Sequence, residues 1–288
     1  MNYNRKQFLQ ISGAAAGAMV LSPVVADFLP DDNARKIKTF GLQLYTLRDV
    51  LLNNPKDILK QVASFGYKQI ESYEGPNGMF WGMSNTDFKK LMDDLSMTII
   101  SSHCDINKDF EKKVDDAAAI GMKSLICPSV DAQKTIDDYK KLAAEFNQCG
   151  EICKKAGIKF AYHNHDHDFK LLEGRVAQDI YMEHTDPTLV EFEMDIYWVV
   201  TAGHDPETWL KKYPNRFRLC HIKDRVKGTT KREDSCDLGK GSIDFPKILK
   251  TARKNGMKYF IVEQEHYPNS TVMKSVDVDA EYMRRVRI

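Results

Sequence analysis

Short apolar runs alternate with amphipathic stretches along most of the chain, and four junctions between them share one local pattern. In each junction a stretch with helical spacing of apolar residues reaches a Gly, and a β-rich apolar run follows it closely. The Gly accepts the left-handed backbone that ends a helix, and the run after it is too short for another helix. The junctions are 64–72 (SFGYKQIES), 119–128 (AIGMKSLICP), 155–163 (KAGIKFAYH) and 254–264 (KNGMKYFIVEQ). A repeated helix, Gly and strand unit predicts parallel strands joined by helices.

The same pattern extended over the rest of the chain predicts eight strands. They are expected near 38–45, 67–73, 97–103, 123–128, 158–163, 188–195, 217–223 and 258–264. Amphipathic stretches between them predict helices, among them 57–65, 87–95, 135–156, 245–255 and 276–286. Eight strands alternating with helices in roughly 250 residues describe a single-domain (β/α)8 TIM barrel. The alternative is a doubly wound open sheet, which would need a Gly-rich phosphate turn after its first strand, and FGLQLYTLRD has none.

The composition supports a large folded domain and excludes one class of partner. With 288 residues and 42% hydrophobic content, the chain can bury a sizeable core. Its 42 Lys and Arg residues are balanced by 41 Asp and Glu residues, so we expect no nucleic acid partner. The six cysteines have neither the spacing of a disulfide framework nor that of a zinc motif, and we expect no cysteine ligand.

The first 26 residues differ from the rest of the chain. Arg5 and Lys6 precede a run of apolar and small residues that ends at Ala26, with no acidic residue. This pattern is typical of an export signal, and RKQFL is similar to a twin-arginine signal with Lys in the second basic place. The run is too short to span a bilayer comfortably. We expect a signal peptide at 1–26, a barrel domain at 27–288, a periplasmic location and no stable membrane span after signal removal, with a docked N-terminal helix as the alternative.

Polar side chains gather at the predicted C-terminal ends of the strands, where a barrel places its active site. A packed barrel interior favours Val, Ile and Leu, so acids and histidines at several strand ends require an explanation. Asp195, His221 and Glu263 end three consecutive strands. A set of two carboxylates and one imidazole suits one divalent metal ion, namely Mn, Mg, Co or Zn.

The fifth predicted strand runs into YHNHDHDF, which is unusually rich in imidazoles and carboxylates. The period of two places His163 and His165 on the same inward face and turns Asn164 away. One of the two histidines could complete the metal coordination while the other faces the substrate. A solvated polar loop is the alternative interpretation.

These residues also carry a resemblance to a known family. FGLQLYTLRD, YHNHDHDF, MDIYWVVTAGHDP, HIKD, GKGSIDF and IVEQEHYP resemble the xylose-isomerase-like superfamily of sugar-phosphate isomerases and epimerases. Within it the sequence is most similar to inosose dehydratases and to exported relatives that act on 3-keto-glycosides. The resemblance implies a TIM barrel enzyme with one divalent metal held by residues of strands five to eight. It matches Asp195, His221 and Glu263 to metal ligands, and it puts His163 where ketose 3-epimerases have a Glu.

The histidine at position 163 favours one reaction over another. The epimerases resemble one another in using two glutamates, one on each face of the substrate carbon, and in this chain that pair is broken. One base and one separate acid suit removal of a proton next to a carbonyl followed by loss of a β-oxygen. We therefore expect a metal-dependent lyase or hydratase acting on a keto sugar, with a ketose isomerase or epimerase as the alternative. A carbohydrate-binding module without chemistry and a multi-metal abasic-site nuclease fit these residues less well.

The remaining inward polar residues receive roles from their positions. His163 is the fourth predicted metal ligand. The candidate base is His165, or His163 if it is not a ligand. Lys223 or a metal-bound water could assist the departing oxygen. Predicted substrate contacts are Gln43, Tyr45, Glu71, His103 and Trp198. The segment 239–242 (GKGS) could cradle an anion, although a helix cap at Ser242 or Asp244 explains the same residues. The expected partner is a small-molecule carbohydrate, and the sequence leaves the oligomeric state open.

Overall fold

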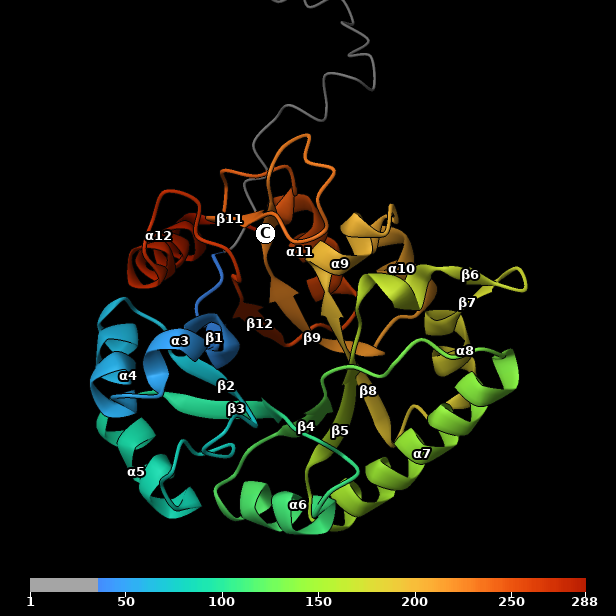
Figure 1. Ribbon diagram of the computed structural model, residues 1–288, viewed down its shortest axis with the longest axis horizontal. Helices are drawn as coiled ribbons and strands as arrows, with labels where there is room; N and C mark the ends of the chain where they lie inside the picture. Colours follow the sequence, from blue (N-terminus) through green and yellow to red (C-terminus); the bar gives the residue numbers. More distant parts are fainter. Residues whose placement is uncertain (1–35) are drawn as a thin grey trace, which may run out of the picture. The chain divides into compact units, whose positions relative to one another are not determined.

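The computed structural model describes residues 36–288, which form a closed parallel barrel (Figure 1). Its strands are β1 (Gly41–Gln43), β2 (Gln69–Tyr73), β3 (Thr98–His103), β4 (Ser124–Cys127), β5 (Lys159–His163), β8 (Val190–Asp195), β9 (Phe217–Ile222) and β12 (Tyr259–Val262). They pair in the order β1-β12-β9-β8-β5-β4-β3-β2, so β12 closes the barrel on β1. The predicted (β/α)8 barrel is confirmed, and each predicted strand range contains one of these strands.

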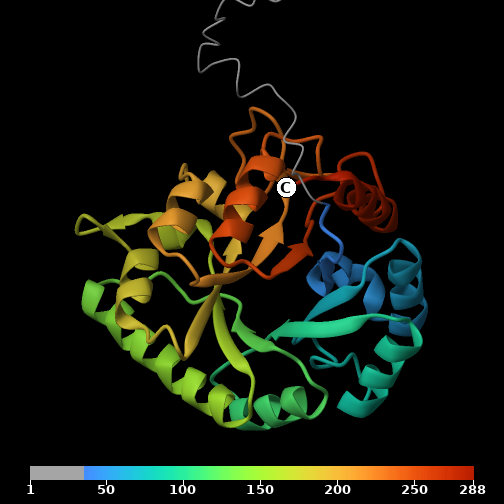
Figure 2. The ribbon, with the colours of Figure 1, turned by 180° about the vertical axis from the view of Figure 1, so that it is seen from behind.

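Helices surround the barrel on its outer side, and Figure 2 shows the same ring from behind. They are α4 (Pro55–Ser64), α5 (Asn85–Asp94), α6 (Phe110–Ala119), α7 (Ile136–Lys155), α8 (Ala177–His184), α10 (Pro206–Lys212), α11 (Phe245–Lys254) and α12 (Val272–Arg285). Shorter elements are η1 (Leu44–Leu47), α3 (Arg48–Leu51), η2 (Asp166–Phe169) and α9 (Ile196–Thr201). Two small hairpins pair β6 (Leu171–Leu172) with β7 (Arg175–Val176) and β10 (Asp224–Arg225) with β11 (Ser235–Cys236).

The repeated helix, Gly and strand pattern has the predicted physical origin. The glycines of the four junctions, Gly66, Gly121, Gly157 and Gly256, have φ angles of 101°, 76°, 80° and 97°. A side chain would strain this left-handed backbone, so Gly can end the helix there and turn the chain into the next strand.

The inside of the barrel is layered along its axis. Ile100, Ile126, Ala161, Leu219 and Ile261 form a small apolar cluster between the strands. Along β9 and β12 the next inward positions are His221 and Glu263, because side chains of alternate residues share a face. Burial of each branched side chain in the apolar layer is worth about 1.5–3 kcal/mol. The layer thus provides a firm base for the polar residues at the C-terminal end of the barrel.

Three further expectations from the sequence concern the signal peptide, membrane spans and the cysteines. The predicted signal peptide at 1–26 and its boundary with the barrel domain lie outside the described residues. Within residues 36–288, no helix combines the length and apolar character that a bilayer span requires. All six cysteines lie in this part of the chain and are free and buried, consistent with the absence of a disulfide pattern in the sequence.

Candidate metal centre and substrate cavity

Asp195 lies at the end of β8, where one of its carboxylate oxygens caps a helix and the other accepts no hydrogen bond. Its Oδ1 accepts a hydrogen bond from the backbone N–H of Trp198 at 3.0 Å and thereby caps α9. The side chain of Asn164 binds the Asp195 backbone in both directions at 3.2 Å, tying β8 to β5. The carboxylate is fully buried, and its Oδ2 accepts no hydrogen bond. The local structure therefore leaves one fixed carboxylate oxygen available.

Two imidazole rings each direct a nitrogen without a hydrogen bond toward Asp195 Oδ2. His163 Nδ1 donates to the carbonyl of Pro128 at 2.9 Å, so the lone pair of that ring lies on Nε2, 3.5 Å from Asp195 Oδ2. His221 Nε2 donates to Glu71 at 2.7 Å, so the ring in its neutral form carries its lone pair on Nδ1, 3.6 Å from the same oxygen. Neither nitrogen has a hydrogen-bond partner, and the three ligand atoms lie within 4.8 Å of one another. Buried polar atoms rarely stay unsatisfied, and these three are ligand types of divalent cations.

Glu263 and Lys223 complete the surroundings of these three atoms. Glu263 Oε2 lies 3.3 Å from His221 Nδ1. The Lys223 ammonium lies 2.9 Å from Glu263 Oε2, 3.1 Å from Asp195 Oδ2 and 2.6 Å from Glu265 Oε1. Three carboxylates facing one ammonium leave two negative charges when both imidazoles are neutral, and a divalent cation would balance them. The residues present therefore fit the predicted ligand set of His163, Asp195, His221 and Glu263.

The charged side chains of this centre stabilise one another in their ionised forms. Burial opposes ionisation of Asp195 and Glu263, but Lys223 and the neighbouring histidines together outweigh it and lower the pKa of both carboxyl groups below their usual range. Burial likewise opposes the charge of Lys223, and Asp195, Glu263 and Glu265 raise the pKa of its ammonium well above its usual value. Lys223 therefore stays a cation that anchors the carboxylates.

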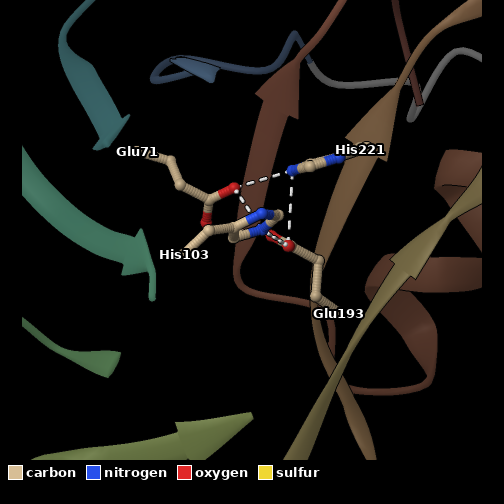
Figure 3. A group of neighbouring side chains, drawn as sticks. All are labelled: Glu71, His103, Glu193 and His221. Carbon is tan, nitrogen blue, oxygen red and sulfur yellow. Dashed lines mark hydrogen bonds and ion pairs between the residues drawn. The ribbon is translucent and has the colours of Figure 1, made fainter. Parts of the chain in front are cut away.

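A second cluster of buried ligand-type residues lies directly beside the first and shares His221 with it. Figure 3 shows Glu71 from β2 and Glu193 from β8 on either side of His103 and His221. Glu71 Oε1 lies 2.7 Å from His221 Nε2 and 3.3 Å from His103 Nε2. Glu193 Oε2 lies 2.8 Å from His103 Nε2 and 3.3 Å from His221 Nε2. Carboxylate oxygens and imidazole N–H groups thus alternate around this cluster.

Hydrogen bonds satisfy this second cluster almost completely. Glu71 also accepts from Gln43 Nε2 at 2.8 Å and from Ser101 Oγ at 2.5 Å. Burial opposes its ionisation, but His103 and His221 outweigh burial and lower the pKa of Glu71 well below its usual range. Burial also opposes the charge of His103, whose pKa is nevertheless raised to about 9 by Glu71 and Glu193. These groups already have partners, so the first cluster is the better candidate for the metal centre.

A cavity of about 740 Å³ opens above the two clusters. His163, Glu263 and Glu265 line its inner part, and the loops after β2, β3 and β4 form its outer wall. Its size is within the range of small-molecule sites. Of the predicted substrate contacts, Tyr45, His103 and Trp198 line the cavity.

Three other predicted site residues lie below the cavity floor. Gln43 and Glu71 are fully buried and bind each other, and Lys223 is 1% exposed among its carboxylates. Neither Gln43 nor Glu71 lines the cavity, so the structure does not bring these two together with the other predicted substrate contacts. Lys223 does not line it either, and its catalytic role stays a prediction.

Three aromatic residues, Tyr45, Tyr73 and Trp198, line the cavity. Trp198 is 3% exposed, and the cations of Arg232 and Lys223 lie 4.3 and 4.7 Å from its ring centroid. Its ring therefore holds cations and is largely covered. Tyr45 is 39% exposed and meets Tyr73 edge to face, with ring centroids 5.2 Å apart. These two tyrosines are the better surface for a sugar ring.

The candidate base has the environment that a neutral imidazole needs. His165 lines the cavity, with its ring centroid 4.9 Å from that of His163. Its Nδ1 is buried without a hydrogen-bond partner. Burial, reinforced by His163, lowers the pKa of His165 well below 6.5. The ring is therefore neutral near pH 7 and able to accept a proton.

Sequence analysis missed three contributors to the site. Glu193 could have been found, since the period of two along VEFEMD puts it on the face of Asp195. Asn164 was expected to point away, yet its side chain fixes the Asp195 backbone. The Pro128 carbonyl that orients His163 has no signal in the sequence, because any residue has a carbonyl group.

The segment 239–242 does not offer its amides to an external anion. The backbone N–H groups of Gly239 and Gly241 both donate to Asp224 Oδ2 at 2.9 Å, and Ile243 N donates to Oδ1 at 3.2 Å. Asp244 caps α11 by accepting from Lys247 N at 3.3 Å. The helix-cap interpretation is thus confirmed, and the protein's own Asp224 occupies the amide cradle.

The fold and the site together define a (β/α)8 barrel with a candidate metal centre at the floor of a small-molecule cavity. The chain belongs to the xylose isomerase-like TIM barrel family, whose model matches residues 59–286. A sugar phosphate isomerase/epimerase from Parabacteroides distasonis is similar to it, with 32% identity and a TM-score of 0.75 over 87% of this chain and 94% of that one.

Two further relatives extend the comparison. An inosose dehydratase from Clostridium perfringens is 33% identical in an alignment over 150 residues that covers 45% of this chain and 48% of that protein. The similarity thus spans about half the length of this curated relative. The IolI protein, solved with a binding zinc atom, is 14% identical with a TM-score of 0.69 over 84% of this chain and 95% of that one. At that identity it shows the fold alone.

Proposed function

We propose that this protein is a divalent-metal-dependent lyase that removes a β-oxygen substituent from a keto sugar. One observation carries the proposal. Three atoms without a hydrogen bond, from His163, Asp195 and His221, converge beside a cavity that a neutral His165 also lines. The similarity to an inosose dehydratase supports a dehydration of this kind.

The ligand set fits a cation held by His163, Asp195, His221 and Glu263. A divalent cation bound there would polarise the substrate carbonyl and stabilise negative charge on its oxygen. His165 is the candidate to accept the proton from the carbon next to that carbonyl, since it is neutral and lines the cavity. The electron pair left by this proton forms the new carbon–carbon double bond as the β-oxygen substituent leaves. General-base assistance of this type is worth about 10²–10⁴ in rate.

Other residues position the reacting groups. Lys223 is bonded to Glu265 and Glu263 and keeps their carboxylates in place. Glu265 lines the cavity and is 26% exposed in its side chain, so its carboxylate could accept a hydrogen bond from a sugar hydroxyl. Tyr45 and Tyr73 cover the outer part of the cavity. We propose a 3-keto-glycoside or an inosose as substrate, because both carry a ring ketone and a β-oxygen.

A substrate panel tests the reaction. The protein is loaded with Mn²⁺, Co²⁺, Zn²⁺ or Mg²⁺ in turn and incubated with 3-keto-glycosides, inososes and unmodified ketoses. We expect formation of an unsaturated keto product, measured by its ultraviolet absorbance and by mass spectrometry, with at least one metal. Efficient epimerisation of free ketoses together with no conversion of the keto sugars would contradict the proposal.

An isomerase or epimerase of keto sugars is the second candidate. The similarity to a sugar phosphate isomerase/epimerase, which extends over 87% of this chain, favours it. It requires a proton donor on the substrate face opposite His165. Exchange of substrate hydrogen with solvent deuterium without elimination would distinguish this function from the lyase.

We also propose that residues 1–26 direct export to the periplasm and are removed. Arg5, Lys6 and the small-residue run ending at Ala26 support this proposal. Intact-mass measurement of protein from the native cell tests it. A native protein that still begins at Met1 would contradict the proposal.

A further inference from the structure

In the cluster of Glu71, His103, Glu193 and His221, only His221 has a role in the reaction described above. The cluster shares His221 with the candidate metal centre, and Figure 3 shows the contacts that its four side chains make with one another. It is also deeply buried, with His103 the most exposed member at 8%. Two buried carboxylates are costly, so their retention at the barrel centre calls for a physical explanation.

Each edge of the His221 ring has a different environment. On one edge Nε2 donates to Glu71 Oε1 at 2.7 Å. On the other edge Nδ1 has no hydrogen bond, and it faces Glu263 Oε2 at 3.3 Å and Asp195 Oδ2 at 3.6 Å. A neutral imidazole carries one proton, so an acceptor fixed at Nε2 leaves the lone pair on Nδ1.

Glu71 is held rigidly as that acceptor. Register pairing places Gln43 of β1 and Ser101 of β3 directly opposite it on the two neighbouring strands. Gln43 donates to the same oxygen that faces His221, at 2.8 Å, and Ser101 donates to the other oxygen at 2.5 Å. Both oxygens are therefore anchored to the barrel wall.

We propose that Glu71 is a positioning residue that holds His221 with its proton on Nε2 and its Nδ1 lone pair toward the divalent cation. Outer partners of this kind orient metal-binding histidines, and their loss typically weakens metal affinity by about 10–100-fold. The inference rests on the proposed function for the presence of a cation. It does not depend on the reaction that the cation supports.

The geometry argues against a second cation within this cluster. Glu71 Oε1 to His221 Nε2 and Glu193 Oε2 to His103 Nε2 are hydrogen bonds of 2.7 and 2.8 Å. The ligating atoms are thus already paired with one another. Among the described residues of this cluster, the buried side-chain atoms without a hydrogen bond are Glu193 Oε1 and His221 Nδ1, and the latter faces the candidate metal centre.

The test measures cation binding rather than turnover. Zn²⁺ and Co²⁺ are titrated into wild-type protein and the Glu71→Ala, Glu71→Gln and Glu191→Gln variants by competition with a chelator of known affinity. We expect Glu71→Ala to weaken binding by about 10–100-fold and Glu71→Gln, whose amide oxygen still accepts a hydrogen bond, by less. Glu191 is the matched control, a glutamate of β8 that lies 3.9 Å from Arg218 outside the cluster, and Glu191→Gln should leave affinity unchanged.

Two further measurements separate positioning from a merely structural role. Thermal unfolding in excess chelator reports the stability of each metal-free variant. Spectra of ¹⁵N-labelled histidine in zinc-loaded wild-type protein should show His221 protonated on Nε2, and a proton on Nδ1 would overturn the inference. If Glu71→Ala and Glu71→Gln lose stability but keep wild-type affinity, Glu71 is structural and the inference is wrong.

The number of cations bound per chain also tests the inference. Two cations per wild-type chain and one in Glu71→Ala would make Glu71 a ligand and overturn the inference. A wild-type protein that binds no cation would contradict both the inference and the proposed function. Weakened binding in Glu71→Ala without conversion of any keto sugar would support the inference while the proposed reaction fails.

Discussion

Two neighbouring groups of buried residues share His221 and contain nearly the same residue types, yet their hydrogen bonding differs. The group of Glu71, His103 and Glu193 around His221 Nε2 is closed by hydrogen bonds at 2.5–2.8 Å. The group of His163 and Asp195 around His221 Nδ1 has three atoms without a hydrogen bond. Burial and residue type alone would identify either group as the candidate metal centre.

The difference shows what identifies a candidate metal centre in a metal-free structure. Ligand-type atoms that already donate and accept among themselves gain less from a cation than atoms whose lone pairs have no partner. Opposite tautomers strengthen this argument, because His163 is fixed through Nδ1 and His221 through Nε2. Each ring thereby presents its free nitrogen to Asp195. The predictions below test this contrast, from the largest expected effect to the smallest.

The largest effect is expected from Asp195→Ala compared with Glu193→Gln. The two residues lie two positions apart on β8 and face the barrel interior, but only Asp195 belongs to the group with free lone pairs. Loss of a direct ligand should weaken cation binding by more than about 100-fold, beyond the loss caused by an outer partner. Glu193→Gln should stay within about tenfold of wild type. Chelator competition measures both, and equal losses in the two variants would remove the distinction between the groups.

The next effect separates the two histidines of β5 and its following turn. His165→Gln should lower kcat by about 10²–10⁴ with cation affinity unchanged, because His165 is the candidate base. His163→Ala should weaken cation binding itself. Steady-state kinetics and cation titration check the pair, with the exposed His184→Asn as control. Full activity in His165→Gln would exclude His165 as the base.

Sequence analysis predicted the barrel well because the fold depends on repeated local signals. The Gly that ends a helix and the apolar run after it are physical requirements visible in the letters, and the order of the strands follows from right-handed parallel connections. The boundaries of the helices were predicted less accurately than their existence. Helix α12 begins at Val272, four residues before the predicted start, because the side chain of Thr271 caps it.

The site was predictable only as far as it depends on strand ends. His163, Asp195 and His221 come together and Glu263 lies 3.3 Å from His221, since each of the four lies at a strand end or within one residue of it. The roles of Gln43 and Glu71 were not predictable, because depth within the barrel decides whether an inward residue touches the cavity. Nor does a sequence reveal which side of an imidazole is already occupied.

The aromatic residues of the cavity show the same contrast between occupied and free groups. Cations cover Trp198, whereas Tyr73 is half-buried and lines the cavity. Tyr73→Ala should raise KM for a keto sugar about tenfold, corresponding to about 1.4 kcal/mol, with kcat little changed. Tyr73→Phe keeps the ring and should keep KM near wild type. An unchanged KM in Tyr73→Ala would show that the substrate does not use this wall.

The smallest effect is expected at a carboxylate whose partners all lie outside the site. Glu207 of α10 binds Lys247 at 2.7 Å, Thr251 Oγ1 at 2.7 Å and Lys211 at 3.3 Å, and so ties α10 to α11. The hydrogen bond from Lys247 outweighs burial and lowers the pKa of Glu207 from 4.5 to about 2. A depressed carboxyl pKa stabilises the folded protein above pH 4.5, and this stabilisation is lost as the pH falls through about 2.

Glu207→Gln should therefore lower the free energy of unfolding by about 1 kcal/mol at pH 7, because the partner lysines are exposed and solvent screens them. The difference from wild type should shrink between pH 4.5 and pH 2, where Glu207 becomes protonated in both states. Urea unfolding at pH 7, 4 and 3 measures this trend. Glu281→Gln is the control, since Glu281 is 49% exposed and pairs with the exposed Arg285. A difference in unfolding free energy that grows on acidification would have the wrong sign for a carboxylate held in its charged form. Cation affinity should be unchanged in Glu207→Gln, because the Glu207 carboxylate is not directed at the metal centre.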